Sequence, residues 1–198
     1  LILAAIFLVI KSILDAADGE LARIKKTPSY TGRYFDSIAD IILNLLIMMA
    51  ICKTTDASIS NTIVAFIGLQ LQGTLYNYYY VILRNKLGGD TTSRIIENNA
   101  PTAMKGEQQK NVQRLFFIYH LLYGYFDRII YRLDKNAAKG KTFPNWFMTA
   151  ISTLGLGFQL LLISLMLILG WKEYIIPFFI GYTFLIVLFV GIRKIWLK

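Results

Sequence analysis

Four aspartates stand in two pairs near the start of the 198-residue chain, and their spacing is suited to chemistry. Asp15 and Asp18 are three residues apart, and Asp36 and Asp40 are four residues apart. Residues at these separations share one face of a helix, so each pair forms an acidic patch if its segment is helical. The segment 24–33 between the pairs contains a proline and a glycine, which allow the chain to fold back. We therefore expect the four carboxylates to converge.

A group of carboxylates in an apolar segment needs a cation to compensate its charge. One unpaired carboxylate costs about 2.5–3.5 kcal/mol at the centre of a membrane helix. Hard oxygen donors suit Mg²⁺ or Mn²⁺, which also share their coordination shell with phosphate oxygens. With a single cysteine and a single histidine in the chain, zinc is disfavoured. The pattern thus predicts a divalent-metal site that acts on a phosphate.

Each pair taken alone has a simpler interpretation. Asp15 and Asp18 could serve only to bind the nearby basic residues Arg23 or Lys25. Asp36 would cap a helix if one began at that position. The spacing of the whole set therefore carries more weight than either pair.

The whole set, from Asp15 to Asp40, reads DxxDGxxARx₈GxxxDxxxD. It resembles, without a gap, the signature of the CDP-alcohol phosphotransferase (CDP-alcohol phosphatidyltransferase) family. Eight positions of this signature are fixed. An unrelated stretch of sequence would match all eight by chance on the order of once in a billion stretches. The resemblance implies an enzyme of phospholipid biosynthesis. It would transfer a phosphoryl-linked alcohol or a phosphatidyl group from a CDP-activated donor, such as CDP-diacylglycerol, to an acceptor alcohol with release of CMP.

The resemblance also implies roles for individual residues. Two ions, Mg²⁺ or Mn²⁺, would be held against the CDP diphosphate by Asp15, Asp18, Asp36 and Asp40, with Asp40 as the general base. The positions that match the CDP-donor site are Asp18, Gly19, Ala22, Arg23 and Gly32. These residue types suit that task, because glycine lets a ligand approach the backbone and arginine offers a planar fork of donors to phosphate.

The elements that must position these residues are membrane helices. A hydrophobic content of 56% and a positive mean hydropathy exceed the usual balance of a soluble domain. Stretches long enough to cross a hydrocarbon layer of about 30 Å predict five spans. They lie at about 1–22, 36–52, 62–84, 146–169 and 174–193. Family members have six such helices, with the motif on the second and third, so we expect one more helix upstream. The predicted fold is an all-α polytopic transmembrane bundle, a single domain over residues 1–198.

The basic residues predict the orientation of this bundle. Of 21 lysines and arginines, only Lys53 and Lys172 lie in the two short connections between spans, whereas 18 flank the opposite ends. The positive-inside rule places the larger group in the cytoplasm. We therefore expect an integral protein of a bacterial inner or cell membrane, with its active site facing the cytoplasm.

A polar connection, residues 85–145, separates the third and fourth spans and forms a predicted cytoplasmic insertion. Over about 112–133, polar residues recur every three to four positions among large apolar ones. This period predicts an amphipathic helix at the membrane interface, although a short extra span fits the length as well. Arg84 and Lys86 precede the insertion. They are candidates for an acceptor phosphate, or alternatively anchors of the third span at the interface.

Two other function classes fit part of the pattern. Membrane prenyl-diphosphate transferases bind diphosphate through aspartate-rich helices, but they need a second acidic cluster, and none follows Asp40. A transporter or channel would use intramembrane acids as an ion path, yet it needs no glycine and arginine at fixed spacings. The partners that we expect are a CDP-linked donor, a polar alcohol acceptor, membrane lipids and a second copy of the chain in a homodimer, with no nucleic acid. The identity of the acceptor stays open among inositol phosphate, glycerol phosphate, serine and related alcohols.

Overall fold

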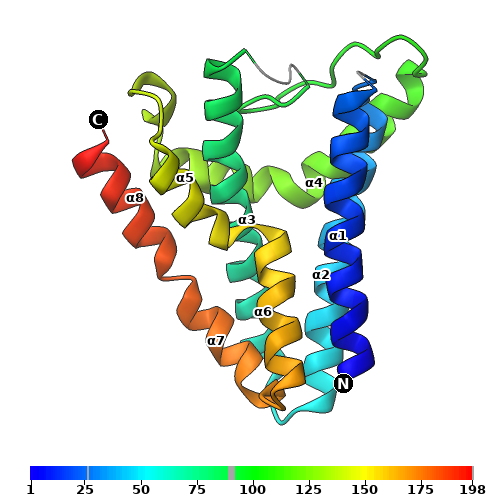
Figure 1. Cartoon of the computed structure of the whole chain (residues 1–198). Helices are drawn as coiled ribbons and strands as arrows, with labels where there is room; N and C mark the ends of the chain where they lie inside the picture. Colours follow the sequence, from blue (N-terminus) through cyan, green and yellow to red (C-terminus); the bar gives the residue numbers. More distant parts are fainter. Residues whose placement is uncertain (26, 89–91, 198) are drawn as a thin grey trace.

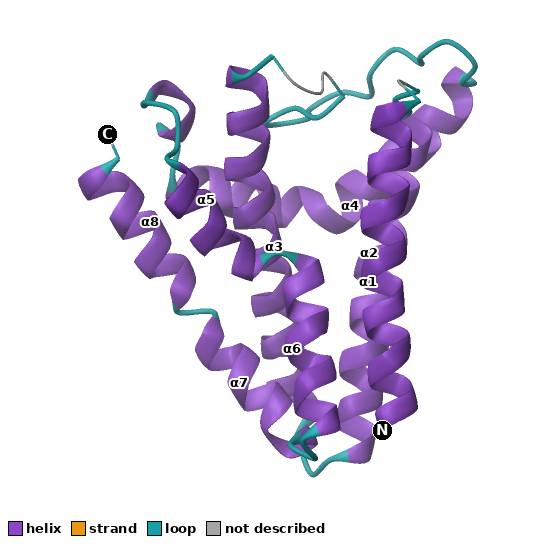
Figure 2. Ribbon diagram, viewed as in Figure 1, coloured by secondary structure: helices purple, strands orange, loops and turns teal. Residues whose placement is uncertain are grey.

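The computed structural model describes residues 1–25, 27–88 and 92–197, apart from the side chains of residues 22 and 23, and these parts are helical with no strand (Figures 1 and 2). The first four helices are α1 (Ile2–Ile24), α2 (Tyr30–Thr54), α3 (Ile59–Lys86) and α4 (Gln109–Leu133). They are followed by η1 (Ala137–Lys139), α5 (Asn145–Ile151), η2 (Ser152–Leu154), α6 (Leu156–Ile168), η3 (Lys172–Tyr174), α7 (Ile175–Tyr182) and α8 (Leu185–Trp196). The prediction of an all-α fold is confirmed.

Helix α3 lies at the centre of the bundle and buries residues along most of its length. It packs against α7, α4 and α2, whereas α1 packs mainly along α6. Helix α4 crosses the bundle transversely rather than running along it (Figure 1). It extends over the segment predicted at 112–133 and begins three residues earlier, at Gln109. Its position at a membrane interface stays a prediction.

Two helical segments of the described residues are long and apolar enough to cross a membrane, Tyr30–Thr54 and Lys172–Trp196. The helices Asn145–Leu154 and Leu156–Ile168 provide a third if they form one span, and they meet at a bend of 54°. These segments correspond to three of the five predicted spans. Because only two or three candidates are found, the five-span count stays a prediction.

Helices α1 and α3 match the other two predicted spans in position but carry polar side chains at mid-length. Lys11, Asp15 and Asp18 lie on α1, and the buried residues Gln70 and Gln72 lie on α3. Ionisable and amide groups are expensive in hydrocarbon unless they have partners inside the protein. Gln72 has such partners, whereas the Gln70 amide nitrogen is buried with no hydrogen-bond partner among the described residues.

A pair of glutamines provides such partners between α3, α6 and α7. The amide nitrogen of Gln72 donates a hydrogen bond to the Thr183 hydroxyl at 3.0 Å, and that of Gln159 donates to the Gln72 amide oxygen at 3.1 Å. Gly68 lies one turn before Gln72, and a Cβ atom there would stand 2.2 Å from the Thr183 hydroxyl oxygen. The close approach of α3 and α7 therefore requires a small residue, as is common where membrane helices pack.

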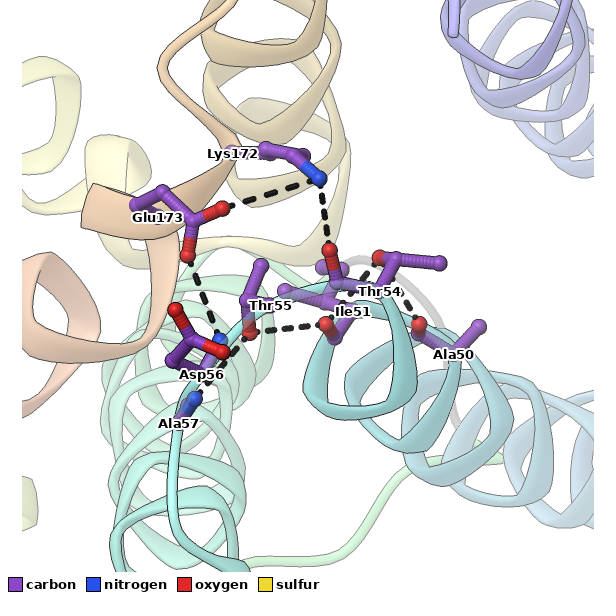
Figure 3. Close-up of polar contacts among 8 residues, drawn as sticks. All are labelled: Ala50, Ile51, Thr54, Thr55, Asp56, Ala57, Lys172 and Glu173. Atoms are coloured by element: carbon purple, nitrogen blue, oxygen red, sulfur yellow. Dashed lines mark hydrogen bonds and ion pairs between the residues drawn. The ribbon is translucent and has the colours of Figure 1, made fainter.

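The two short connections meet at one end of the bundle (Figure 3). The Lys172 ammonium donates to the carbonyl of Thr54 at 2.6 Å, and the Glu173 carboxylate accepts from the backbone N–H of Asp56 at 3.4 Å. The C-terminus and the α3–α4 connection lie at the other end (Figure 1). A chain that alternates across a membrane needs its short connections at one end and its long connection at the other, and the alternation itself stays a prediction.

A buried ion pair fastens the C-terminal helix α8 to α3 and to the end of α4. Arg193 and Asp134 are 4% and 1% exposed, and the Arg193 Nε–H donates to Asp134 Oδ2 at 2.5 Å. The Tyr79 hydroxyl donates to the same oxygen at 2.7 Å, and the Tyr78 hydroxyl donates to the Asp134 carbonyl at 2.7 Å. Every charge in this cluster thus has a partner.

Asp134→Asn is expected to lower the melting temperature in detergent by roughly 6–20 °C, because removal of one partner leaves the Arg193 charge buried and unpaired, a loss of about 3–5 kcal/mol. Asp56→Asn is the matched control, since Asp56 is exposed at the opposite end of the bundle. Equal melting temperatures for the Asp134→Asn and wild-type proteins would show that the buried pair does not support the fold.

Candidate active site

Helices α1 and α2 carry the two halves of the motif. Asp15 and Asp18 lie in the second half of α1. Helix α2 begins at Tyr30, because the Ser29 hydroxyl caps it by accepting from the Gly32 N–H at 3.0 Å. The interpretation of Asp36 as a helix cap is therefore wrong, since that residue lies in the interior of α2. Asp36 and Asp40 follow one turn apart on the same helix face.

A lysine that the motif does not include joins its two halves. The Lys11 ammonium on α1 donates to Asp40 Oδ1 on α2 at 2.5 Å and also to Asp15 Oδ2. The side chains of Lys11 and Asp40 are partly buried, at 23% and 19% exposure. Sequence reasoning missed this contact, although the four-residue spacing of Lys11 and Asp15 is a recognisable ion-pair signal.

The four carboxylates do not converge in the way that the spacing predicted. Among the described residues, no group of three or more histidine, cysteine, aspartate or glutamate side chains lies close enough to hold a metal ion. The reason is the packing, since α1 follows α6 while α2 follows α3 and α4. Asp18 and Asp36 are exposed. The assignment of all four aspartates as metal ligands stays a prediction.

The type and charge of these donors nevertheless fit a divalent cation. The oxygens of Asp15 and Asp40 already share one positive group, the Lys11 ammonium, across the two helices. Carboxylate oxygens are the ligands that Mg²⁺ prefers in proteins and that suit Mn²⁺ as well. Lys11 offsets one of the four carboxylate charges of the motif, so most of its negative charge remains to attract a dication.

The glycines of the motif have open space or ordinary contacts beside them. A Cβ atom at Gly19 would meet no atom within 4 Å, and one at Gly32 would lie 3.4 Å from the Ser29 hydroxyl oxygen. Packing within the described residues therefore does not require glycine at position 19, which leaves room for a ligand to approach the helix there. The side chains of Ala22 and Arg23 lie outside the described residues.

Tyr123 of α4 lies within electrostatic range of Asp36 and Asp40 of α2, and sequence reasoning did not identify it. Burial raises the pKa of Tyr123, and the negative charges of Asp40, Asp127 and Asp36 raise it further. The hydroxyl therefore stays protonated and is available as a hydrogen-bond donor on this side of the site. Its position follows from the crossing of α2 and α4, which the spacing of residues within one helix cannot reveal.

The α3–α4 connection holds the first turn of α2 through Glu97. Arg33 donates to Glu97 Oε2 at 2.8 Å, and the Tyr34 hydroxyl donates to the same oxygen at 2.5 Å. The Arg33 guanidinium also lies over the Tyr34 ring, 4.6 Å from its centroid. These contacts orient the helix that carries Asp36 and Asp40.

Glu107 provides a second attachment at the same place. Its Oε1 accepts from the Ser29 hydroxyl at 2.9 Å and from the Thr31 N–H at 2.6 Å, and its Oε2 accepts from the Met104 N–H at 3.0 Å. Burial raises the pKa of Glu107, but the hydrogen bonds outweigh burial and lower the pKa from 4.5 to about 2. A carboxylate at a helix N-terminus is also favoured by the helix dipole.

The contribution of Glu107 to stability is expected to depend on pH. Its folded-state pKa is depressed, so the stabilisation is fully present above pH 4.5 and is lost as the pH falls toward 2. Glu107→Gln should therefore lower the melting temperature at pH 7, and the difference from wild type should shrink below pH 4.5. Melting curves of both proteins from pH 7 to pH 3 measure this. A difference that stays constant over the range would contradict the assignment.

A small polar cavity opens between α2, α3, α4 and the α3–α4 connection. It has room for about one water molecule. Its lining includes Arg33, Asn77, Arg94, Glu97, Tyr119 and Asp127. Burial raises the pKa of Asp127 to about 6, although the hydrogen bond from the Tyr119 hydroxyl opposes the shift. Sequence reasoning missed this cavity because its walls come from segments far apart in the chain.

The two residues predicted to bind an acceptor phosphate lie at the end of α3. The Lys86 ammonium donates to the backbone carbonyls of Gly140 and Lys141, the second at 3.0 Å. The Arg84 guanidinium lies over the Tyr80 ring, 5.2 Å from its centroid. Lys86 thus helps to hold the α4–α5 connection, and a role of either residue toward an acceptor stays a prediction.

Comparison with known families identifies the chain. A family model described as CDP-alcohol phosphatidyltransferase matches residues 1–125, which comprise α1 to α3, most of α4 and the whole motif. No curated protein and no solved structure matches the chain. Members of the family are transferases that move phospholipid head groups with CDP-alcohols, generally with Mg²⁺ or Mn²⁺. Because the matched segment covers more than half of its length, the chain belongs to the CDP-alcohol phosphatidyltransferase family.

Proposed function

We propose that this protein transfers a phosphatidyl group from CDP-diacylglycerol to a polar alcohol and releases CMP. The observation that carries the proposal is the placement of the complete motif on two adjoining helices, with Asp15 of α1 and Asp40 of α2 linked through one cation. Family membership supports the reaction class. The choice of donor is our proposal.

In this proposal Asp15, Asp18, Asp36 and Asp40 would hold two Mg²⁺ or Mn²⁺ ions. When bound, such ions would neutralise the donor diphosphate and make CMP a better leaving group. Asp40 accepts the proton of the acceptor hydroxyl as the general base. The hydroxyl oxygen then forms a bond to the phosphorus that carries the diacylglycerol, and the bond from that phosphorus to the CMP oxygen breaks.

The donor occupies the side of α1 that bears Gly19. Open space at Gly19 supports this assignment, because a diphosphate needs close access to the helix there. Asp18, Ala22, Arg23 and Gly32 complete the donor site by their match to the family motif. Arg84 and Lys86 are proposed for the acceptor, which they reach after Lys86 leaves its two carbonyl partners.

The test is turnover by the full-length protein of CDP-diacylglycerol with glycerol phosphate, serine, inositol and inositol phosphate, each with Mg²⁺ or Mn²⁺. We expect CMP release with one acceptor well above the others. A transporter, a channel or a prenyl-diphosphate transferase would release no CMP. Absence of CMP with every acceptor would overturn the proposed donor.

We also propose that the motif end of the bundle faces the cytoplasm of a bacterial cell and that the protein is a homodimer. The insertion 85–145 would then lie on the cytoplasmic side, with α4 at the membrane surface. Exposed apolar side chains at a helical spacing on α4 support that placement, namely Phe117, Leu121 and Tyr125.

Cysteine labelling in a Cys52→Ser background is expected to place Ser29→Cys inside the cell and Ser58→Cys outside. The two positions form a matched pair, because both serines are N-caps, of α2 and α3 respectively, so both substitutions remove the same type of contact. An impermeant maleimide added to intact cells should label position 58 and spare position 29. Labelling of position 29 from outside would reverse the proposed orientation.

A further inference from the structure

Lys11 contacts both halves of the acidic motif but is not part of the motif. Its ammonium donates to one oxygen of Asp15 and one oxygen of Asp40, which belong to different helices. We propose that Lys11 is a built-in counter-cation that competes with the divalent ion for these two carboxylates. The inference rests on the proposed function in one respect, the assignment of Asp15 and Asp40 as metal ligands.

The geometry supports competition because the ammonium already occupies one oxygen of each carboxylate that a metal ion would use. A dication bound to Asp15 and Asp40 takes its bonds from their carboxylate oxygens, and the ammonium donates to an oxygen of each. A hydrogen bond directed at a carboxylate oxygen shields its negative charge from a second cation on that side. The two cations would also lie close together and repel each other, so each weakens the binding of the other to the pair.

Charge and flexibility decide which cation can give way. A dication interacts with a carboxylate about twice as strongly as an ammonium at equal distance and dielectric constant. The Lys11 side chain has a flexible four-carbon stem, so its ammonium can withdraw without any movement of α1. The helix backbone itself is held by its packing along α6. Entry of a metal ion thus requires only a change of side-chain rotamer.

The contact also has a benefit for the protein. Within the described residues, Lys11 bridges an aspartate of α1 and an aspartate of α2. Its positive charge offsets part of the repulsion among the four carboxylates of the motif. It therefore keeps Asp15 and Asp40 close together and makes the dication bind more weakly than the bare carboxylates would. The carboxylates attract the dication and Lys11 competes with it, so the metal ion can bind and leave during a catalytic cycle.

The first test measures Mn²⁺ binding to purified full-length protein without substrate, by the electron paramagnetic resonance signal of free Mn²⁺. Lys11→Met is expected to tighten the dissociation constant about tenfold, within the usual range of coupling between two sites. Lys11→Arg keeps the charge and should stay within about twofold of wild type. Lys53→Met is the matched control, because it removes one lysine at the far end of α2.

Unchanged or weaker Mn²⁺ binding by Lys11→Met would overturn the inference while leaving the metal site of the proposed function in place. If neither wild type nor Lys11→Met binds Mn²⁺, the ligand assignment fails together with the inference. The two failures are thus distinguished by the wild-type measurement alone.

The second test uses the wild-type protein, so it does not depend on the folding of a variant. Detergent-solubilised protein is treated with a small neutral amine-modifying reagent, with and without Mg²⁺, and modified peptides are quantified by mass spectrometry. Mg²⁺ should increase modification of Lys11 severalfold, because its ammonium leaves the two carboxylates, and should leave Lys53 unchanged. Equal or reduced modification of Lys11 in Mg²⁺ would show that the lysine stays in place.

Discussion

Asparagine at position 15 or at position 36 is expected to abolish metal-dependent turnover of CDP-diacylglycerol while the protein still inserts and folds. The substitution removes the negative charge of a proposed ligand and keeps the shape of the side chain. Asp36 is exposed and Asp15 is 38% exposed, so neither carboxylate is needed to fill the core. Loss of a ligand weakens the binding of the ions that would neutralise the diphosphate. Each bound ion would stabilise the charge of the transition state by several kcal/mol.

Both variants should be measured beside wild type for CMP release over a range of Mg²⁺ and Mn²⁺ concentrations. Asp56→Asn serves as the control, since it makes the same chemical change at an exposed position outside the motif. Either metal should restore a chelated wild-type sample, and Zn²⁺ alone should not. Wild-type turnover in the Asp15→Asn or Asp36→Asn protein would refute the assignment of that residue to the metal site.

The two variants should differ in a second property. Asp15 holds the Lys11 ammonium, whereas no hydrogen bond of the Asp36 side chain is found among the described residues. Asp15→Asn should therefore also lower the melting temperature in chelator, and Asp36→Asn should not. Equal loss of turnover with unequal loss of stability would separate the metal role of Asp15 from its contact with Lys11.

The helical content and the position of α2 could be predicted from the sequence because they follow from local pattern. Residues 36–52 are mostly apolar, with Asp40 and Asn44 as polar interruptions, and the helix found there runs from Tyr30 to Thr54. The bend between α5 and α6 could not be predicted in that way. The stretch 146–169 reads as one continuous span, but the chain breaks at Gly155, where a Cβ atom would lie 3.1 Å from the Tyr76 ring. Contact with α3 therefore accompanies the break, and hydropathy does not reveal it.

The candidate site divides in the same way between local and distant contacts. The pairing of aspartates within one helix could be predicted, because a spacing of three or four residues determines a shared face. The contact of Lys11 with Asp40 joins residues 29 positions apart, and that of Arg33 with Glu97 joins residues 64 apart. Such contacts depend on how helices pack. The expected convergence of all four carboxylates assumed that α1 and α2 pack closely along their motif faces. Within the described residues, Asp15 and Asp40 meet at the Lys11 ammonium, and the four-ligand site stays a prediction.

Asp40→Asn is expected to lower turnover by about 10²–10⁴-fold, the usual contribution of a positioned general base. Asp40 lies one turn beyond Asp36 on the same face of α2, so it can approach the metal site and still reach an acceptor hydroxyl. Its side chain is 19% exposed, compared with 38% for Asp15. The more buried carboxylate is the better placed to work away from bulk water.

The variant should separate the chemical step from donor binding. An amide cannot accept the proton of the acceptor hydroxyl, so kcat should fall and the acidic limb of its pH profile should disappear. The affinity for the CDP donor should change less than in Asp15→Asn, because a base acts on the acceptor rather than on the diphosphate. Titration of CDP in Mg²⁺ and steady-state kinetics over pH measure the two quantities.

If Asp40→Asn loses donor affinity as severely as Asp15→Asn and keeps the wild-type pH profile, Asp40 is a metal ligand alone. The proton must then be taken by another group near the site, and the Asp127 carboxylate, with a pKa of about 6, would be the next to replace.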